Sequence, residues 1–417
     1  LNRTDADFIT SVGEGTTVWN STNPTSTVFS LGNSSATNGL DGSYVAYLFA
    51  HNAGGYGLTG TDNIVSCGSF TADGSGNASI TLGYEPQWVM YKCTSQAGND
   101  WEMNDTMRSL SLSSWRVLWA NLSLAESNYD AYVATQGIFP NSTGFTLKSV
   151  GAGRTFIYIA IRRGPMKVPT VGTSVFTPAT RTGTGAAATI TSAGFPIDLI
   201  ISGDRNTARG FGWDDRLSGA KQSLRSWDTA GYTSDTEGVT GFDSMTGMSL
   251  GNGSTFGGSY NVSGETYVYE MLRRAPSFFD IVCYTGTAPT AQNLTHNLSV
   301  APEFIIIKQR GAGGSWFTGS MFTSTTVTRA VLNANNDQDL NSLLSGQSIF
   351  NGQPTSSVFS VGTGSGANAV GGTYVAYLFA TCAGVSKVGS YTGTAALLTV
   401  NCGFTSGARF VLIKNMR

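Results

Sequence analysis

The sequence predicts an all-β fold, built from tandem antiparallel β-sandwich modules of a jelly-roll-like kind that repeat about every 110 residues. Three observations predict it: a composition poor in charge and rich in glycine, a phrase that recurs along the chain, and short apolar runs between turns. Of the 417 residues, 12% are charged and 53 are glycine. Surface helices use many Lys and Glu residues, whereas Gly and Asn turns between Thr-, Tyr- and Val-rich strands use few.

The recurring phrase is the main signal for domain organisation. It reads SYVAYLF at residues 43–49, TFIYIAI at 155–161, TYVYEML at 266–272 and TYVAYLF at 373–379. Successive copies begin 112, 111 and 107 residues apart. Such regular spacing indicates tandem copies of one domain, each about as long as a single antiparallel sandwich.

Two kinds of apolar segment accompany the phrase in each copy. A short alternating segment precedes it, as in Phe29-Ser30-Leu31, and suits a strand with one wet face. A continuous apolar run follows the phrase and suits a strand buried on both faces; the runs lie at 89–92, 199–202, 305–308 and 411–414. The predicted modules are therefore 51–165, 166–275 and 276–380, with the second part of a module at 1–50 and the first part of another at 381–417.

The two partial modules at the ends are out of phase with the repeat. Half a sandwich cannot bury its apolar face, so each end needs further strands. We consider three sources: chain missing on either side, which we favour, a neighbouring subunit, or pairing of the two ends of one chain. The last combines only 50 and 37 residues, fewer than one period. Because the chain starts without Met or a signal-peptide pattern, we interpret it as processed or as part of a longer polypeptide.

Charge and hydropathy exclude two classes of partner. The net charge is −2, from 24 Lys and Arg residues against 26 Asp and Glu residues, with no long run of either sign. Without a basic face that follows a phosphate backbone, we predict no nucleic-acid partner. No stretch approaches about 20 apolar residues, so we predict no membrane insertion.

The residues that carry chemistry form no recognisable catalytic or metal-binding set, so we predict a protein that is not an enzyme and has no cofactor. The only histidines, His51 and His296, stand at different positions of different modules, and we expect His296 in a solvated turn or bonded locally. Neither a Ser-His-Asp triad nor a metal cluster can be assembled from the repeat. The five cysteines are odd in number and include no CxxC pair, which argues against a disulfide framework or a zinc site.

A Trp-acid-Arg segment after the apolar run is the best local candidate for ligand binding. An exposed Trp can stack on a sugar ring while neighbouring polar groups bind its hydroxyls. We favour the alternative, a Trp packed on its own sandwich under a local ion pair, because Trp316 of a third copy has neither an acid nor an Arg nearby. The candidate residues are Trp101, Asp105 and Arg108 in one copy and Trp213, Asp215 and Arg216 in the next.

Long phrases of the chain resemble those of a known group of phage proteins. They are YVAYLFA at 374–380, GVSKVGSYTG at 384–393, VLIK at 411–414, AIRRGPMKVP at 160–169 and LRRAP at 272–276. Together they resemble repeat-containing, tail-fibre-like and virion structural proteins of tailed bacteriophages, especially marine ones. The resemblance covers essentially the whole chain.

The resemblance implies a structural component of the virion surface: a tail fibre, a tail appendage or a capsid-surface fibre that contributes to host attachment. It implies other virion proteins and further copies of the chain as partners, with a trimer as the expected oligomer and a host surface glycan as the receptor. One alternative is a lectin-like glycan-binding module, which predicts Trp101 and Trp213 exposed on loops. A further alternative, a glycan depolymerase, predicts a cleft with two carboxylates.

Overall fold

The computed structural model describes residues 18–108, 110–253, 260–322, 326–333, 339–342 and 348–415. The predicted all-β class is confirmed, since strands make up 35% of the structure and helices 4%. The helical turns with printed bounds are α2 (Ser35–Asn38), η1 (Asp130–Tyr132), η2 (Gly172–Ser174) and α3 (Ser365–Asn368). Within the described ranges, no helix has the length and hydropathy to cross a membrane.

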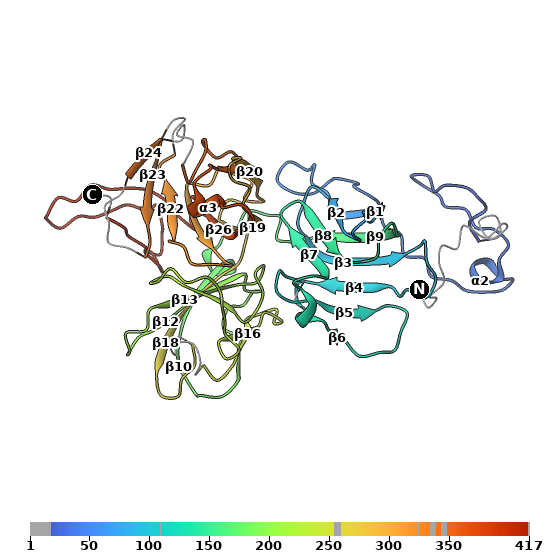
Figure 1. Cartoon of the computed structure of the whole chain (residues 1–417), viewed down its shortest axis with the longest axis horizontal. Helices are drawn as coiled ribbons and strands as arrows, with labels where there is room; N and C mark the ends of the chain where they lie inside the picture. The colour runs from blue at the N-terminus through green and yellow to red at the C-terminus, as the bar shows by residue number, and fades with distance from the viewer. Residues whose placement is uncertain are drawn as a thin grey trace.

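Three successive β-sandwiches form the body of the chain (Figure 1). The first sandwich has the six-stranded sheet β1-β9-β3-β4-β5-β6 and the three-stranded sheet β2-β8-β7. Its strands are β1 (Val65–Thr71), β2 (Ala78–Thr81), β3 (Pro86–Cys93), β4 (Glu102–Asp105), β5 (Arg116–Trp119), β6 (Ser127–Asn128), β7 (Gly137–Asn141), β8 (Gly144–Lys148) and β9 (Thr155–Arg162).

The second sandwich repeats this topology, with sheets β10-β18-β12-β13-β14-β15 and β11-β17-β16. Its strands are β10 (Phe176–Thr182), β11 (Ala188–Ile190), β12 (Leu199–Asp204), β13 (Phe211–Asp215), β14 (Gln222–Arg225), β15 (Thr233–Ser234), β16 (Val239–Gly241), β17 (Met248–Leu250) and β18 (Thr266–Leu272).

The third sandwich repeats it again, with sheets β19-β26-β21-β22-β23-β24 and β20-β25. An isolated bridge between Phe350 and Val361 stands where the other two sandwiches have a third strand in the small sheet. The strands of the third sandwich are β19 (Phe279–Thr285), β20 (Gln292–Thr295), β21 (Phe304–Gln309), β22 (Phe317–Ser320), β23 (Thr326–Val331), β24 (Asp339–Ser342), β25 (Val358–Val361) and β26 (Thr373–Phe379).

The recurring phrase occupies the same place in every sandwich. It forms β9, β18 and β26, and each of these strands pairs antiparallel with the first strand of its module on one side and with the apolar run on the other. Both faces of β26 are buried from Tyr374 to Leu378, whereas buried and half-buried residues alternate along most of β18 and Ile157 of β9 is exposed. The sequence period therefore reflects a repeated sheet topology.

The second and third sandwiches share a hydrophobic core as well as having cores of their own. Trp213 of β13 lies with its ring centroid 5.2 Å from that of Trp316 and 5.3 Å from that of Tyr377 in β26. The indole N–H of Trp316 donates to the carbonyl oxygen of Arg225 at 2.7 Å. Aromatic pairs at this distance contribute packing beyond their buried area, and buried residues of both modules form one continuous hydrophobic cluster.

Within residues 18–50 and 381–415, none of the expected strands of the two partial modules is formed. Residues 43–49 and 411–414 are outside any strand, although the same phrases are central strands in the sandwiches. The physical reason is the lack of neighbours, because a strand needs partners for its backbone N–H and C=O groups. Tyr47 is 83% exposed as a result.

Candidate functional site

Six charged side chains meet where the three sandwiches come together, and we call them the junction cluster. Each sandwich supplies at least one acid from a strand or from the residue next to it, and the bases follow strands that end at the junction. The carboxylates and guanidinium groups balance in number. The members are Glu85, Asp198 and Asp280 on the acidic side and Arg163, Arg216 and Arg274 on the basic side.

The central contact of the junction cluster is the ion pair between Glu85 and Arg274. The two Nη atoms of Arg274 lie 2.8 and 2.9 Å from the two Oε atoms of Glu85, so the pair is bidentate. Glu85 is 2% and Arg274 1% exposed. Burial alone would lower the pKa of Arg274, but Glu85, Asp198 and Asp280 outweigh it and raise that pKa above its usual value. The guanidinium group of Arg274 therefore keeps its charge in the interior.

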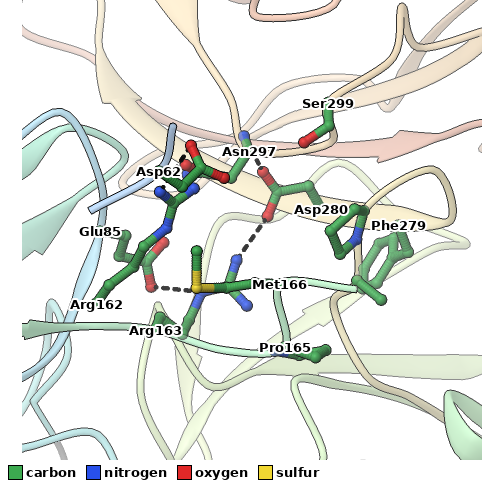
Figure 2. Close-up of a pocket in the computed structure, with 12 residues that line it drawn as sticks. Asp62, Glu85, Arg162, Arg163, Pro165, Met166, Phe279, Asp280, Asn297 and Ser299 are labelled. Atoms are coloured by element: carbon green, nitrogen blue, oxygen red, sulfur yellow. Dashed lines mark hydrogen bonds and ion pairs between the residues drawn. The ribbon is translucent and has the colours of Figure 1, made fainter. Parts of the chain in front are cut away.

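Arg163 extends this contact to the third sandwich. Its Nε lies 3.4 Å from Glu85 and its Nη2 lies 3.3 Å from Asp280 (Figure 2). The other oxygen of Asp280 accepts a hydrogen bond from the backbone N–H of Asn297 at 2.7 Å. Arg163 thus connects an acid of the first sandwich with an acid of the third.

Asp198 completes the acidic side in the second sandwich. It accepts a hydrogen bond from the backbone N–H of Arg274 at 2.7 Å, and its Oδ1 lies 3.4 Å from Arg274 Nε and 3.6 Å from Arg216 Nε. Burial raises the pKa of Asp198, but the charges of Arg274, Arg163 and Arg216 lower it further, so it ends below its usual value. Burial lowers the pKa of Arg216 to about 10 despite the opposing effect of Asp198.

The cavity at the edge of the junction cluster is too small for an organic ligand. Its volume is about 20 Å³, which is room for roughly one water molecule. Its lining includes Asp62, whose carboxylate lies 3.1 Å from Arg162 Nη1 (Figure 2). The geometry of the junction cluster is that of a joint between modules rather than of a binding pocket.

The predicted residues Trp213, Asp215 and Arg216 lie inside the molecule. Trp213 is 5% exposed, so it presents no free face to a sugar, and the expectation of an exposed loop is wrong for this residue. Its ring is covered because the third sandwich packs on β13. Asp215, fully buried, accepts hydrogen bonds from the hydroxyl groups of Ser218 at 2.8 Å and Tyr377 at 3.1 Å.

Arg216 pairs with Asp198 rather than with Asp215, the acid that precedes it in the sequence. Its side chain turns to Asp198 and donates from Nε to the carbonyl oxygen of Ile197 at 3.0 Å and from Nη1 to that of Thr106 at 3.1 Å. Because Thr106 belongs to the first sandwich, the side chain of Arg216 connects the second sandwich with the first. Asp215 and Arg216 are adjacent in sequence, but Asp215 contacts the third sandwich and Arg216 contacts the first.

The corresponding residues of the first sandwich lie nearer the surface. Asp105 Oδ2 accepts from Arg108 Nε at 2.7 Å, and its Oδ1 accepts from the backbone N–H groups of Met107 and Arg108. Arg108 also reaches Glu126 at 3.1 Å. Trp101 is partly buried and begins the same segment. The structure therefore brings Asp105 and Arg108 together, as the segment predicts.

Comparison with models of protein families assigns the chain to one family. The family model described as "Domain of unknown function (DUF7483)" matches residues 1–165 and 172–417, which is nearly the whole chain. The chain belongs to this family. No curated protein matches it. Residues 166–171, between the two matched segments of the DUF7483 chain, lie between β9 and β10, where the first sandwich passes into the second.

Sequence reasoning did not assign the junction cluster of this DUF7483 protein, although one signal was present. Arg163 and Arg274 stand in the similar phrases IRRGP and LRRAP, directly after two copies of the recurring strand. A pair of arginines kept at the end of a buried strand indicates a buried partner. The partners Glu85 and Asp280 occur in dissimilar contexts, so no repeat pattern points to them.

His296 bonds locally, as one of the two expectations for it states, but it is buried rather than solvated. The ring is 6% exposed; Nδ1 accepts from the backbone N–H of Leu298, and Nε2 lies 3.2 Å from the carbonyl oxygen of Thr355. Burial lowers its pKa. Over the described part of this DUF7483 chain, no group of three or more His, Cys, Asp or Glu residues has the arrangement to hold a metal ion.

Proposed function

We propose that this chain is a structural component of a bacteriophage virion surface, as a tail fibre, tail appendage or capsid-surface fibre that contributes to host attachment. The observation that carries the proposal is the junction cluster, which fixes three copies of one sandwich to each other through buried ion pairs. A surface appendage must transmit force and resist proteases. Modules joined by a shared core and a buried charge network meet both needs better than modules on flexible linkers.

The positions of the perturbed carboxylates support a role without catalysis. Asp198 bonds to arginines, and Asp214 lies fully buried beside Tyr260 and Ser223 in the second sandwich. Catalytic carboxylates need access to a substrate, whereas these two are sealed by their own and neighbouring modules. Burial raises the pKa of Asp198 but the charges of Arg274, Arg163 and Arg216 outweigh it and lower that pKa, whereas burial raises the pKa of Asp214.

The resemblance of long phrases to those of phage virion proteins is the reason for proposing a phage particle. The phrase at 374–380 forms β26 and the arginine phrases at 160–169 and 272–276 begin in or directly after β9 and β18. Three of the five phrases therefore lie in parts of the sequence that build and join the modules. This supports a shared scaffold role rather than a shared chemistry.

The test is to locate the chain in particles. Phage particles purified from a producing lysate are analysed by mass spectrometry and labelled with gold-coupled antibody against residues 51–380. We expect peptides of all three sandwiches in a fixed ratio to the major capsid protein, with gold on an appendage or the capsid surface. Recovery of the chain only from the soluble fraction, with particles free of its peptides, would overturn the proposal.

A further inference from the structure

The turn that follows β20 joins the third sandwich to the first, and we call residues 295–299 the contact turn. The hydroxyl groups of Thr295 and Ser142 lie 2.8 Å apart, and Nδ2 of Asn297 donates to the carbonyl oxygen of Ser142 at 3.3 Å. Ser142 lies between β7 and β8 of the first sandwich. The backbone N–H of Asn297 donates to Asp280, whose other oxygen meets an arginine of the first sandwich (Figure 2). The contact between these two sandwiches therefore depends on the shape of this turn.

The ring of His296 holds the contact turn in shape, and its bonds are those of a neutral imidazole. Nδ1 accepts a hydrogen bond from the backbone N–H of Leu298 at 3.2 Å. Nε2 lies 3.2 Å from the carbonyl oxygen of Thr355, to which it can only donate. A neutral imidazole has one accepting and one donating nitrogen, so this pattern uses both. The ring thus fixes the path of the backbone between residues 296 and 298.

A second proton on the ring removes the bond at Nδ1. In the charged imidazole both nitrogens are donors, so Nδ1–H would face the N–H of Leu298. Leu298 is 0% exposed, and its N–H would be left without an acceptor inside the third sandwich. An unpaired buried donor is strongly unfavourable. The ring and the backbone N–H therefore cannot both keep their positions once the ring is charged.

The charge that faces the ring comes from the same carboxylate that holds the contact turn. Burial lowers the pKa of His296, and the charge of Asp280 opposes this effect. The other segments beside the ring, 353–359 in the third sandwich and 139–145 in the first, contain no ionisable residue. A charged ring therefore competes for Asp280 with the N–H of Asn297 and with Arg163.

We propose that the contact turn is an acid-sensitive switch, in which protonation of His296 withdraws Asn297 from its two partners and the first sandwich separates from the third. The second and third sandwiches stay packed, because the hydrophobic cluster that they share contains no histidine. The first sandwich stays attached to the second through the ion pair between Glu85 and Arg274. The switch does not depend on the virion proposal.

Small-angle X-ray scattering of the full chain between pH 7.5 and 5.0 measures the separation of the sandwiches. We expect the radius of gyration and the largest dimension to rise as pH falls and to return at pH 7.5, while circular dichroism shows unchanged strand content. Opening takes up one proton, so between pH 6.5 and the lower pKa of the buried ring the ratio of open to closed molecules rises about tenfold per pH unit.

His296→Asn keeps the switch closed. The side-chain oxygen of Asn accepts a hydrogen bond from the backbone N–H two residues on, as Nδ1 of the ring does, and the amide does not titrate. We expect this variant to keep its dimensions at pH 5.0. His296→Gln, which keeps a donor for Thr355 and does not titrate either, gives the same test if His296→Asn fails to fold. His51→Asn is the matched control, since His51 also accepts from a backbone N–H, that of Cys67, but is exposed; it responds to pH as the wild type does.

Hydrogen exchange, corrected for the effect of pH on the intrinsic rate, distinguishes a local change from separation of the sandwiches. In the wild type we expect the amides of Asn297 and Leu298 to lose protection over the same pH range in which the dimensions rise. Three results overturn the proposal: dimensions that stay constant down to pH 5.0, loss of protection without a change in dimensions, or dimensions that rise equally in the folded His296 variants.

Discussion

Glu85→Gln tests whether the junction cluster holds the modules together. The change keeps the size and shape of the side chain but removes the charge that Arg274 meets in two hydrogen bonds of 2.8 and 2.9 Å. Two acids then face three guanidinium groups, all in positions with little access to water. Removing one partner of a buried ion pair leaves an uncompensated charge and costs about 3–5 kcal/mol.

The bidentate geometry and the 1–2% exposure of both partners place the expected loss of unfolding free energy within that range. The assay is urea unfolding followed by tryptophan fluorescence, together with limited proteolysis in the segment 163–175, which is cleaved faster when the junction opens. Glu126→Gln is the control, since Glu126 meets Arg108 at 3.1 Å with about a third of its side chain exposed. An exposed pair of this kind is worth less than about 1 kcal/mol.

A second variant separates the charge from the packing. Glu85→Met combined with Arg274→Leu removes both charges of the pair, and we expect it to cost less than Glu85→Gln alone. The reasoning is refuted if Glu85→Gln lowers the unfolding free energy no more than Glu126→Gln does, or if the double variant is the less stable of the two. Either result would mean that water reaches the junction and screens its charges.

Three further predictions concern the interior. Burial, with Asp235 and Asp215 nearby, raises the pKa of Asp214 well above its usual value, so the folded state keeps the proton that the unfolded state loses above about pH 4. Asp214→Asn should therefore gain stability over wild type as pH rises from 4 to 7, by at most about 1.4 kcal/mol per pH unit; a pH-independent difference in urea midpoints would contradict this. Burial lowers the pKa of His296 below 6.5, so the stability that the neutral ring contributes is present above pH 6.5 and is lost as pH falls. His296→Gln should flatten this part of the profile between pH 7.5 and 5.5, and an unchanged slope would show that the ring is hydrated. Trp316→Ala should cost about 3–5 kcal/mol because the side chain is fully buried between two sandwiches, and calorimetry that shows no loss would mean that the sandwiches are independent.

The fold could be predicted from the sequence because the signals for it are local and repeated. The recurring phrase identifies β9, β18 and β26, and the apolar runs identify their neighbours β3, β12 and β21. Alternation and continuity of apolar residues record whether one face or both faces are buried, and this information stays within each strand.

The junction cluster could not be predicted because its members come from different modules. Glu85 and Arg274 are 189 positions apart in the chain, and no periodic pattern relates an acid of one module to a base of the next. The burial of Trp213 under the third sandwich could not be predicted for the same reason. Its own module gives no sign that another sandwich will cover it. The way in which copies pack on each other depends on the few residues that differ between them.

Unequal contributions to the junction also mean that the three modules are not interchangeable. The first gives Glu85 and Arg163, the second Asp198 with Arg216 and Arg274, and the third Asp280. Deleting or duplicating the second or the third module would leave a buried charge unmatched, even though the new chain would still read as a regular repeat. Modules with the same topology thus depend on their order in the chain, because the buried acids and bases that pair with each other belong to different modules. In this chain, module number and module order are set together by a balance of six charges.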